Sequence, residues 1–366
     1  MATTRGYALT VTLGIRSTPV NQPMGADPVS YTLLRSFDYF YYPVCFSLNV
    51  IGTVTNIANL VVFFRMGLKD VVNFSFFTLA VSDMLFSVAM AFVVYGGLVL
   101  TLAFPRELWA YDLVPFSINF IFYTVIFKDT TVVITAYIAV ARCCLVALPL
   151  QFKSIFTSGR TRGVLVTIVV VVTILHLPLY FTQGVAWAYD PRTNTTRIYF
   201  WQVDARRYTL EYNDIVVKNI IPNTCLAIII ISLVVMSVKL SAASKFRKMM
   251  SNNANKQAEH DLEKKKSSSH QLSPKDIRVV KAVCSVAALY VFSTLPLVLQ
   301  SIARLVIPEF NFGKSLQNTY NFVMVFSTTV GNFNSAFNFF LYFKYNTKFR
   351  HILLAGCTPP DFLSAP

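Results

Sequence analysis

Residues 164–172 read VLVTIVVVV, and residues 50–64 read VIGTVTNIANLVVFF. A helix built from either stretch has no polar face, unlike the amphipathic helices that cover a soluble core. The hydrocarbon core of a bilayer takes about 20 consecutive, mostly apolar residues of helix. Both stretches therefore predict helices that cross a membrane.

Seven runs of this kind follow one another along the 366-residue chain. The sequence is 55% hydrophobic and only 13% charged, which agrees with a membrane protein. We predict an all-α membrane protein, a bundle of seven transmembrane helices with a short amphipathic helix after the last span. The expected spans are residues 39–64, 72–100, 114–141, 163–187, 213–238, 277–307 and 318–343.

The polar segments complete the predicted domain organisation. Residues 1–38 are expected to form an extracellular amino-terminal segment, and residues 39–343 the bundle. The longest connection, residues 241–276, has too few apolar residues to pack and is expected to be a flexible cytoplasmic loop. Residues 344–366 are the predicted cytoplasmic tail, which contains the short amphipathic helix.

The basic residues lie mainly on one side of the predicted membrane. With the amino terminus outside, 20 of the 32 Lys and Arg residues lie on the inner side, 11 of them in the third inner connection. Cytoplasmic loops carry such an excess. We expect a multi-pass protein of the plasma membrane with an extracellular amino terminus. Contact with anionic inner-leaflet lipid is a secondary role, and nucleic-acid binding is not needed to explain the charge.

Other motifs concern covalent chemistry. The sequence has no metal-ligand spacing, phosphate-binding loop or nucleophile elbow, so an enzyme is not expected. Asn194 begins a glycosylation sequon in a predicted outer loop. None of the six cysteines falls in a predicted outer loop, so no extracellular disulfide is expected. Cys357, beyond the amphipathic segment, is a candidate for palmitoylation, with a free thiol as the alternative.

Polar residues inside the spans are informative, because a charged group at the centre of a membrane helix costs on the order of 3 kcal/mol. Asp83 therefore needs polar partners, and Asn56 of the first span can serve. Asn334, Asn338 and Tyr342 of the last span are spaced four residues apart and form one stripe. The alternative is a hydrogen-bond network that only holds the helices together.

Arg142 ends the third apolar run, where an isolated arginine is usually an interfacial anchor. The motifs around it point further. In chain order they are Asn56, residues 79–83 (LAVSD), residues 141–143 (ARC) with Pro149, Pro222, Pro296, residues 338–342 (NFFLY) and residues 348–350 (KFR). Over residues 40–355 this series resembles the rhodopsin-like G-protein-coupled receptors. Residues 143–153 and 334–344 are also similar to gastropod chemosensory receptors and invertebrate FMRFamide-type peptide receptors.

The resemblance implies a receptor that binds an extracellular small molecule or peptide and activates a heterotrimeric G protein, with arrestin as a further partner. Arg142, Asn338 and Tyr342 would take part in the activation switch. A sodium or water pocket is implied at residues of the polar core, and sodium is the one cofactor implied. The residues of this core are Asn56, Asp83, Thr131 and Asn334.

The chain also departs from the family pattern. Ala141 stands where the family has an acid that restrains the arginine, and Ser117 stands where it has a disulfide-forming cysteine. Asp276 lies about 30 Å of helix before Pro296, close to the level of Arg142. We predict an Arg142–Asp276 ion pair that closes the inactive state. The alternative is that Asp276 only belongs to a helix start at Ser273-Pro274.

Four charged residues are candidates for the ligand cavity. Lys128 lies about 21 Å from Arg142 along the third span and projects close to the same stripe, whereas Asp129 should meet a different neighbour. Lys218 and Arg304 are expected to share the cavity with Lys128. Two or three cations there would favour an anionic group such as a carboxylate. The alternative is that protein partners neutralise Lys128 and Asp129.

The favoured function is a chemosensory receptor, with a peptide receptor as the alternative. A seven-span transporter or channel is less favoured, because the sequence lacks a repeat between its halves and helices broken by paired Gly and Pro. A non-signalling decoy is a further alternative, given Ala141, Thr294 and Phe339.

Overall fold

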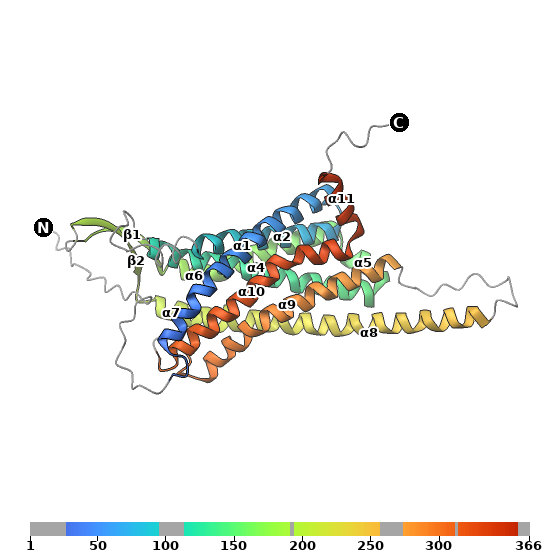
Figure 1. Ribbon diagram of the computed structural model, residues 1–366. Helices are drawn as coiled ribbons and strands as arrows, with labels where there is room; N and C mark the ends of the chain where they lie inside the picture. The colour runs from blue at the N-terminus through green and yellow to red at the C-terminus, as the bar shows by residue number, and fades with distance from the viewer. Residues whose placement is uncertain (1–26, 95–112, 191–193, 257–273, 312–313, 358–366) are drawn as a thin grey trace.

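A computed structural model describes residues 27–94, 113–190, 194–256, 274–311 and 314–357. Within these ranges, seven long helical segments lie side by side (Figure 1), which confirms the predicted bundle. A short helix, α11 (Thr347–Cys357), follows the last segment as predicted. The segments are α1 (Tyr31–Met66), α2 (Val71–Val94), α4 (Leu113–Ala147), α6 (Ser158–Tyr180), the continuous run α7 (Arg206–Tyr212), η3 (Asn213–Ile220) and α8 (Ile221–Lys256), α9 (Pro274–Val306) and α10 (Gln317–Tyr345).

Six helices of the described part of the chain are long and apolar enough to cross a membrane. The seventh segment, α10, is more polar, since asparagine and serine side chains lie along it. These side chains, Asn332, Asn334, Ser335 and Asn338, are buried inside the bundle. A span can carry such residues when they face the protein interior.

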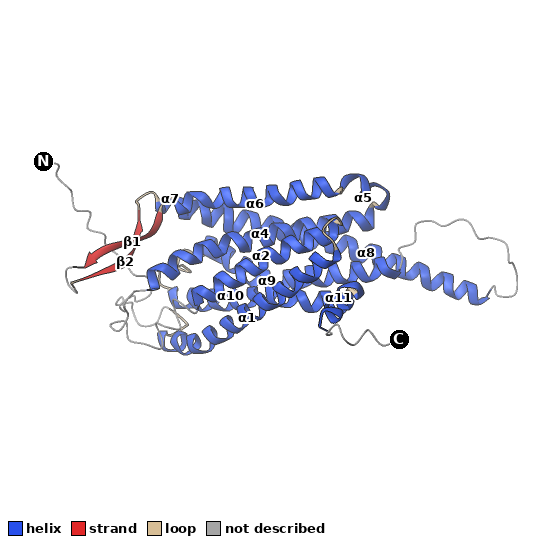
Figure 2. Ribbon diagram, turned by 90° about the horizontal axis from the view of Figure 1, so that it is seen from above, coloured by secondary structure: helices blue, strands red, loops and turns tan. Residues whose placement is uncertain are grey.

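The two ends of the bundle differ. At one end, β1 (Gln183–Asp190) and β2 (Thr195–Gln202) form an antiparallel hairpin that projects beyond the helices (Figure 2). At the other end lie the short helices α5 (Pro149–Ile155) and α11 (Figure 1). We call these the hairpin end and the α11 end.

Local sequence accounts for several helix boundaries. The hydroxyl of Ser30 accepts a hydrogen bond from the backbone nitrogen of Leu33 (3.1 Å), which caps α1. Thr157 caps α6 in the same way through Arg160 (3.4 Å). Gly67 ends α1 with a φ of 95°, a conformation that favours glycine.

The fifth segment contains a π-helical stretch, η3, directly before the proline of α8. A proline nitrogen carries no hydrogen, so Pro222 cannot donate to the carbonyl of Lys218 four residues earlier. That carbonyl instead accepts a hydrogen bond from the hydroxyl of Ser301 on α9 (3.0 Å). The proline therefore frees a backbone group that ties α9 to the fifth segment.

Buried apolar side chains fill the bundle along its length. Toward the α11 end, the aromatic rings of Phe63, Phe76, Tyr342 and Phe349 pack together. A second cluster joins α4, α8 and α9 around Tyr290, and a third joins α1, α2 and α10.

Several predicted boundaries were wrong. The first helix begins at Tyr31, eight residues before the predicted start at 39 and inside the predicted amino-terminal segment. The fourth span ends at Tyr180, not at residue 187, because the chain from Gln183 pairs with β2. The fifth segment begins at Arg206, seven residues before the predicted start at 213. The predicted loop 241–276 is helical at both ends, since α8 continues to Lys256 and α9 begins at Pro274. Residues 257–273, and the predicted end of the second span at 95–100, lie outside the described residues.

Candidate functional site

Asp83 is the centre of a buried polar network and is only 2% exposed. One carboxylate oxygen accepts a hydrogen bond from the hydroxyl of Thr131 on α4 (2.9 Å). The other accepts one from the side-chain amide of Asn338 on α10 (3.0 Å). An acid in the middle of α2 is thus stabilised by helices from two sides, as buried charge requires.

Ser335, which was not among the predicted site residues, extends this network to α1. Its hydroxyl donates to the carbonyl of Asp83 (3.1 Å) and lies 2.9 Å from the hydroxyl of Ser87. Its own carbonyl accepts a hydrogen bond from Asn56 (3.0 Å). A Cβ on Gly52 would lie 2.7 Å from the Ser87 hydroxyl, so glycine permits the close approach of α1 and α2. Small residues at such a crossing are typical of membrane helices.

Three buried amide oxygens near this network have no protein partner among the described residues. They are Oδ1 of Asn59, whose amide nitrogen donates to Asn56, and Oδ1 of Asn334 and Asn338 on α10. Asn334 lies one helical turn from Asn338 on the same face of α10. Carboxylate, hydroxyl and amide oxygens are the ligand types that suit a hard cation such as sodium.

Arg142 is buried near the α11 end of α4, with 4% exposure. Its guanidinium lies 5.7 Å from the centre of the Phe76 ring, which itself lies 5.0 Å from the ring of Tyr342. Among the described groups, the acid that attracts Arg142 electrostatically is Asp70, just before α2. The side chain of Asp276 lies outside the described residues, although α9 does begin at Pro274, as the helix-start alternative expects.

The four ligand candidates do not converge on one site. Lys218 and Arg304 both bind Asp214, a residue that the sequence analysis did not select. The ammonium of Lys218 lies 2.8 Å from one carboxylate oxygen, and Arg304 donates to the other at 2.8 Å. Arg304 also donates to Asn311 (3.1 Å). Because one acid balances two cations, this cluster keeps one excess positive charge.

Asp129 also has a protein partner, which removes it from the candidate ligand contacts. One of its carboxylate oxygens lies 3.1 Å from Nε2 of His176 on α6. Nδ1 of this histidine lies 2.8 Å from the carbonyl of Val172. The role of His176 was not predicted, because nothing in the sequence pairs one residue of α6 with one residue of α4.

Lys128 differs from the other three candidates. A Cβ built on Gly331 of α10 would lie 3.6 Å from its ammonium and 3.0 Å from a methyl carbon of Leu297 on α9. The lysine therefore points between α9 and α10 at the level of Leu297. Among the described residues, its ammonium makes no hydrogen bond or ion pair, and its nearest counter-charge is its chain neighbour Asp129.

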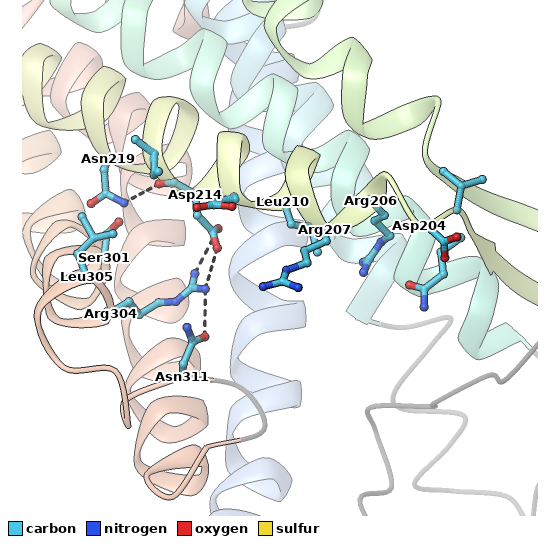
Figure 3. Close-up of a pocket in the computed structure, with 14 residues that line it drawn as sticks. Asp204, Arg206, Arg207, Leu210, Asp214, Asn219, Ser301, Arg304, Leu305 and Asn311 are labelled. Atoms are coloured by element: carbon cyan, nitrogen blue, oxygen red, sulfur yellow. Dashed lines mark hydrogen bonds and ion pairs between the residues drawn. The ribbon is translucent and has the colours of Figure 1, made fainter.

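A pocket of about 870 Å³ opens at the hairpin end between the β2 end, α7, η3 and α9 (Figure 3). Arginines and acids alternate around it. Figure 3 shows Arg206 and Arg207 extending from α7 on one side, and Arg304 bound to Asp214 on the other. Ser301 also lines it, and Leu297 lies one turn of α9, about 6 Å, deeper in the bundle. Lys128, at the level of Leu297, therefore lies deeper in the bundle than Ser301, and it does not line this pocket.

The modification candidates lie at opposite ends. Asn194 lies at the exposed turn of the hairpin, with a φ of 53° that asparagine tolerates better than most residues. Its side-chain oxygen accepts a hydrogen bond from the Tyr189 hydroxyl (2.6 Å). Cys357 is the last residue of α11, and its side chain lies outside the described residues.

Comparison with known proteins adds one finding. The family model described as "7 transmembrane receptor (rhodopsin family)" matches residues 56–342, which include the Asp83 network and Arg142. No curated protein matches the chain significantly.

Proposed function

The chain belongs to the rhodopsin family of seven-transmembrane receptors, and from this premise we propose that it is a chemosensory receptor of the plasma membrane for a small ligand with a carboxylate group. Membership in this family makes the chain a multi-pass membrane protein and a signalling receptor, not an enzyme. An extracellular ligand and a heterotrimeric G protein are its partners. The chemosensory role, the ligand class and the orientation are the parts proposed here.

The proposed orientation places the hairpin end outside the cell. The excess of Lys and Arg in the connections near the α11 end supports it, because such residues favour the cytoplasmic side. The same orientation puts Asn194 where it can be glycosylated. The pocket at the hairpin end would then open to the extracellular solution.

The proposal rests on the ammonium of Lys128, which has no ion pair among the described residues. Lysines inside membrane bundles normally pair with an acid, with backbone carbonyls or with water. Lys218 and Arg304 have such a partner in Asp214, whereas Lys128 makes no ion pair among the described residues. An anionic group that reached Lys128 from the pocket would supply the missing partner. Its interaction would be strong, because it would form in a place of low dielectric constant.

Binding at this level offers a route to activation. Lys128 and Arg142 lie on the same helix, α4, and Lys128 faces α9 and α10. A receptor of this kind exchanges between an inactive and an active conformation. A ligand that draws these helices together in only one of the two conformations would shift the equilibrium toward it. We further propose that sodium binds among Asp83, Thr131, Asn334 and Asn338 and stabilises one of these states.

The test is expression in cells with a promiscuous G protein, and a screen of organic acids, amino acids, amines and short amidated peptides. We expect an acid to act as agonist and Lys128→Met to abolish the response while surface expression persists. Lys218→Met is the matched control and should keep the response, since Lys218 is held by Asp214. An undiminished response of Lys128→Met would refute the ligand assignment.

Arg142→Ala tests signalling separately. A receptor that signals should lose the G-protein response but still bind the ligand. Ligand binding without any G-protein response in the unchanged protein would favour the decoy.

A peptide receptor is the second candidate, and the pocket favours it. A volume of about 870 Å³ lies at the upper end for small-molecule sites, and the acids in its lining can bind the amino-terminal ammonium and the basic side chains of an amidated peptide. A response to amidated peptides that depends on Asp214 and not on Lys128 would select this alternative.

A further inference from the structure

A second large hollow lies on the side of the bundle, where the protein meets lipid. This lateral groove of about 910 Å³ is lined by residues of α4, α6, the α5 end, and the junction of η3 and α8, among them Tyr137, Arg160, Gly163, Val171, Leu175 and Ile221. α6 and α8 both pack on α4, but α6 approaches the fifth segment at α7 and η3, near the hairpin end. The two helices therefore leave a gap over α4.

The groove runs along the membrane, not into the bundle. Val164 and Val171 of α6 and Ile220 of the fifth segment line it and are 42%, 46% and 55% exposed. From Arg160 to Leu175 it covers 16 residues of α6, or about 22 Å of helix. A bilayer core is about 30 Å thick, so this length exceeds the hydrocarbon depth of one leaflet.

The groove has one charged end. Among the described residues that line it, Arg160 alone is charged, and it lies in the first turn of α6. One nitrogen of its guanidinium donates to the carbonyl of Ser154 (2.7 Å), which leaves other N–H groups for a ligand. Beside it, the Tyr137 hydroxyl already donates to Thr161 (2.9 Å). This end of the groove therefore offers a cation. The Tyr137 hydroxyl already donates its proton to Thr161, so it has none to donate to a ligand with a neutral hydroxyl group.

We propose that the lateral groove binds an anionic phospholipid of the leaflet at the α11 end. Its headgroup phosphate is bound by Arg160, and one acyl chain lies between α6 and α8 over Tyr137 and Val133. The apolar walls match a hydrocarbon chain, and the single cation at the membrane surface matches a phosphate. Lys153 and Arg162 lie near the same surface but do not line the groove.

The test is native mass spectrometry of the purified full-length receptor in detergent, titrated separately with phosphatidylserine, phosphatidylcholine and cholesterol. We expect phosphatidylserine to bind most tightly. Arg160→Gln should weaken it about fivefold, the effect typical of one basic residue at a lipid surface, and weaken phosphatidylcholine less, because the choline ammonium offsets the charge of its phosphate. Lys153→Gln, which removes an exposed charge outside the groove, should change neither.

A second variant fills the groove. A Cβ on Gly163 would have no atom within 4 Å, so Gly163→Phe can be accommodated and should place its ring in the groove. It should weaken both phospholipids. On the unchanged receptor, phosphatidylserine with a photoreactive acyl chain should cross-link to α6 between residues 163 and 175.

Several results would overturn the proposal. Equal affinity for phosphatidylserine and phosphatidylcholine, or an equal effect of Lys153→Gln and Arg160→Gln, would indicate a nonspecific lipid shell. Tighter binding of cholesterol, sensitive to Gly163→Phe but not to Arg160→Gln, would make the groove a sterol site. Cross-linking confined to other helices would exclude the groove.

Discussion

The guanidinium of Arg142 lies over the ring of Phe76, 5.7 Å from its centre. The family resemblance gives this arginine to the activation switch, yet Ala141 supplies no acid to restrain it. The contact with α2 is therefore a physical restraint on Arg142 that the described residues do provide. A cation over an aromatic ring contributes about 0.5–2 kcal/mol, more when it is buried.

Phe76→Leu should raise basal G-protein signalling about two- to tenfold, because it removes the ring and keeps an apolar side chain. The measurement is second-messenger production without ligand, normalised to surface expression. Phe64→Leu is the control, since Phe64 is 67% exposed on α1. A basal signal equal to that of the unchanged receptor would show that Phe76 does not restrain Arg142.

Asp83→Asn should abolish any stabilisation by sodium, because the carboxylate is the one charged ligand of the proposed site. The measurement is the thermal unfolding midpoint in sodium chloride against choline chloride at equal ionic strength. Asp27→Asn, which changes an acid at the hairpin end, should keep the difference. If the unchanged receptor shows no difference between the salts, sodium is not a ligand.

The Asp129–His176 pair makes a prediction about stability. The carbonyl of Val172 can only accept, so Nδ1 of His176 donates to it, and a proton lies between Nε2 and the Asp129 carboxylate. Asp129→Asn can still donate to Nε2, whereas Asp129→Leu leaves Nε2 unpaired. The leucine variant should be less stable than the asparagine variant by about 1–3 kcal/mol in thermal unfolding.

The double variant Asp129→Leu with His176→Leu is the companion measurement. It should recover much of the loss, since no polar group is then left unpaired. Equal stability of the leucine and asparagine single variants would contradict the inferred hydrogen bond.

Asp27 should hold the amino-terminal segment on α10. Its carboxylate accepts hydrogen bonds from the backbone of Asn318 (2.7 Å) and Thr319 (3.2 Å), where α10 begins. Asp27→Ala should cost about 1 kcal/mol, as the loss of a helix cap does. Hydrogen exchange at residues 318–320 should speed up, whereas Asp204→Ala, an exposed acid near the hairpin, should leave it unchanged.

The central part of the candidate site could be predicted from the sequence. An acid inside an apolar run needs polar partners, and the spacing of Asn334, Asn338 and Tyr342 placed three of them on one face of a helix. The structure confirms the bond between Asp83 and Asn338. The role of Ser335 was not predicted, because single serines are common in membrane helices. Ser335 also does not share the four-residue spacing of Asn334, Asn338 and Tyr342.

The ligand residues could not be assigned in this way. Lys128, Lys218 and Arg304 look alike in the sequence, as cations in or near spans. Their surroundings separate them, since Asp214 lies one turn before Lys218 and reaches Arg304 on another helix. The hairpin was missed for a related reason: its residues 183–187 are apolar enough to extend a span, and only pairing with β2 makes them a strand.

The apolar runs are enough to predict seven membrane-spanning segments, because the cost of burying polar groups in hydrocarbon acts on each segment separately. The sequence also predicts the orientation and the need of Asp83 for partners. Which charges are balanced depends on how the helices pack, since an ion pair needs atoms a few ångströms apart on helices distant in sequence. That is why Asp129 meets His176, Lys218 and Arg304 share Asp214, and Lys128 has no ion pair among the described residues.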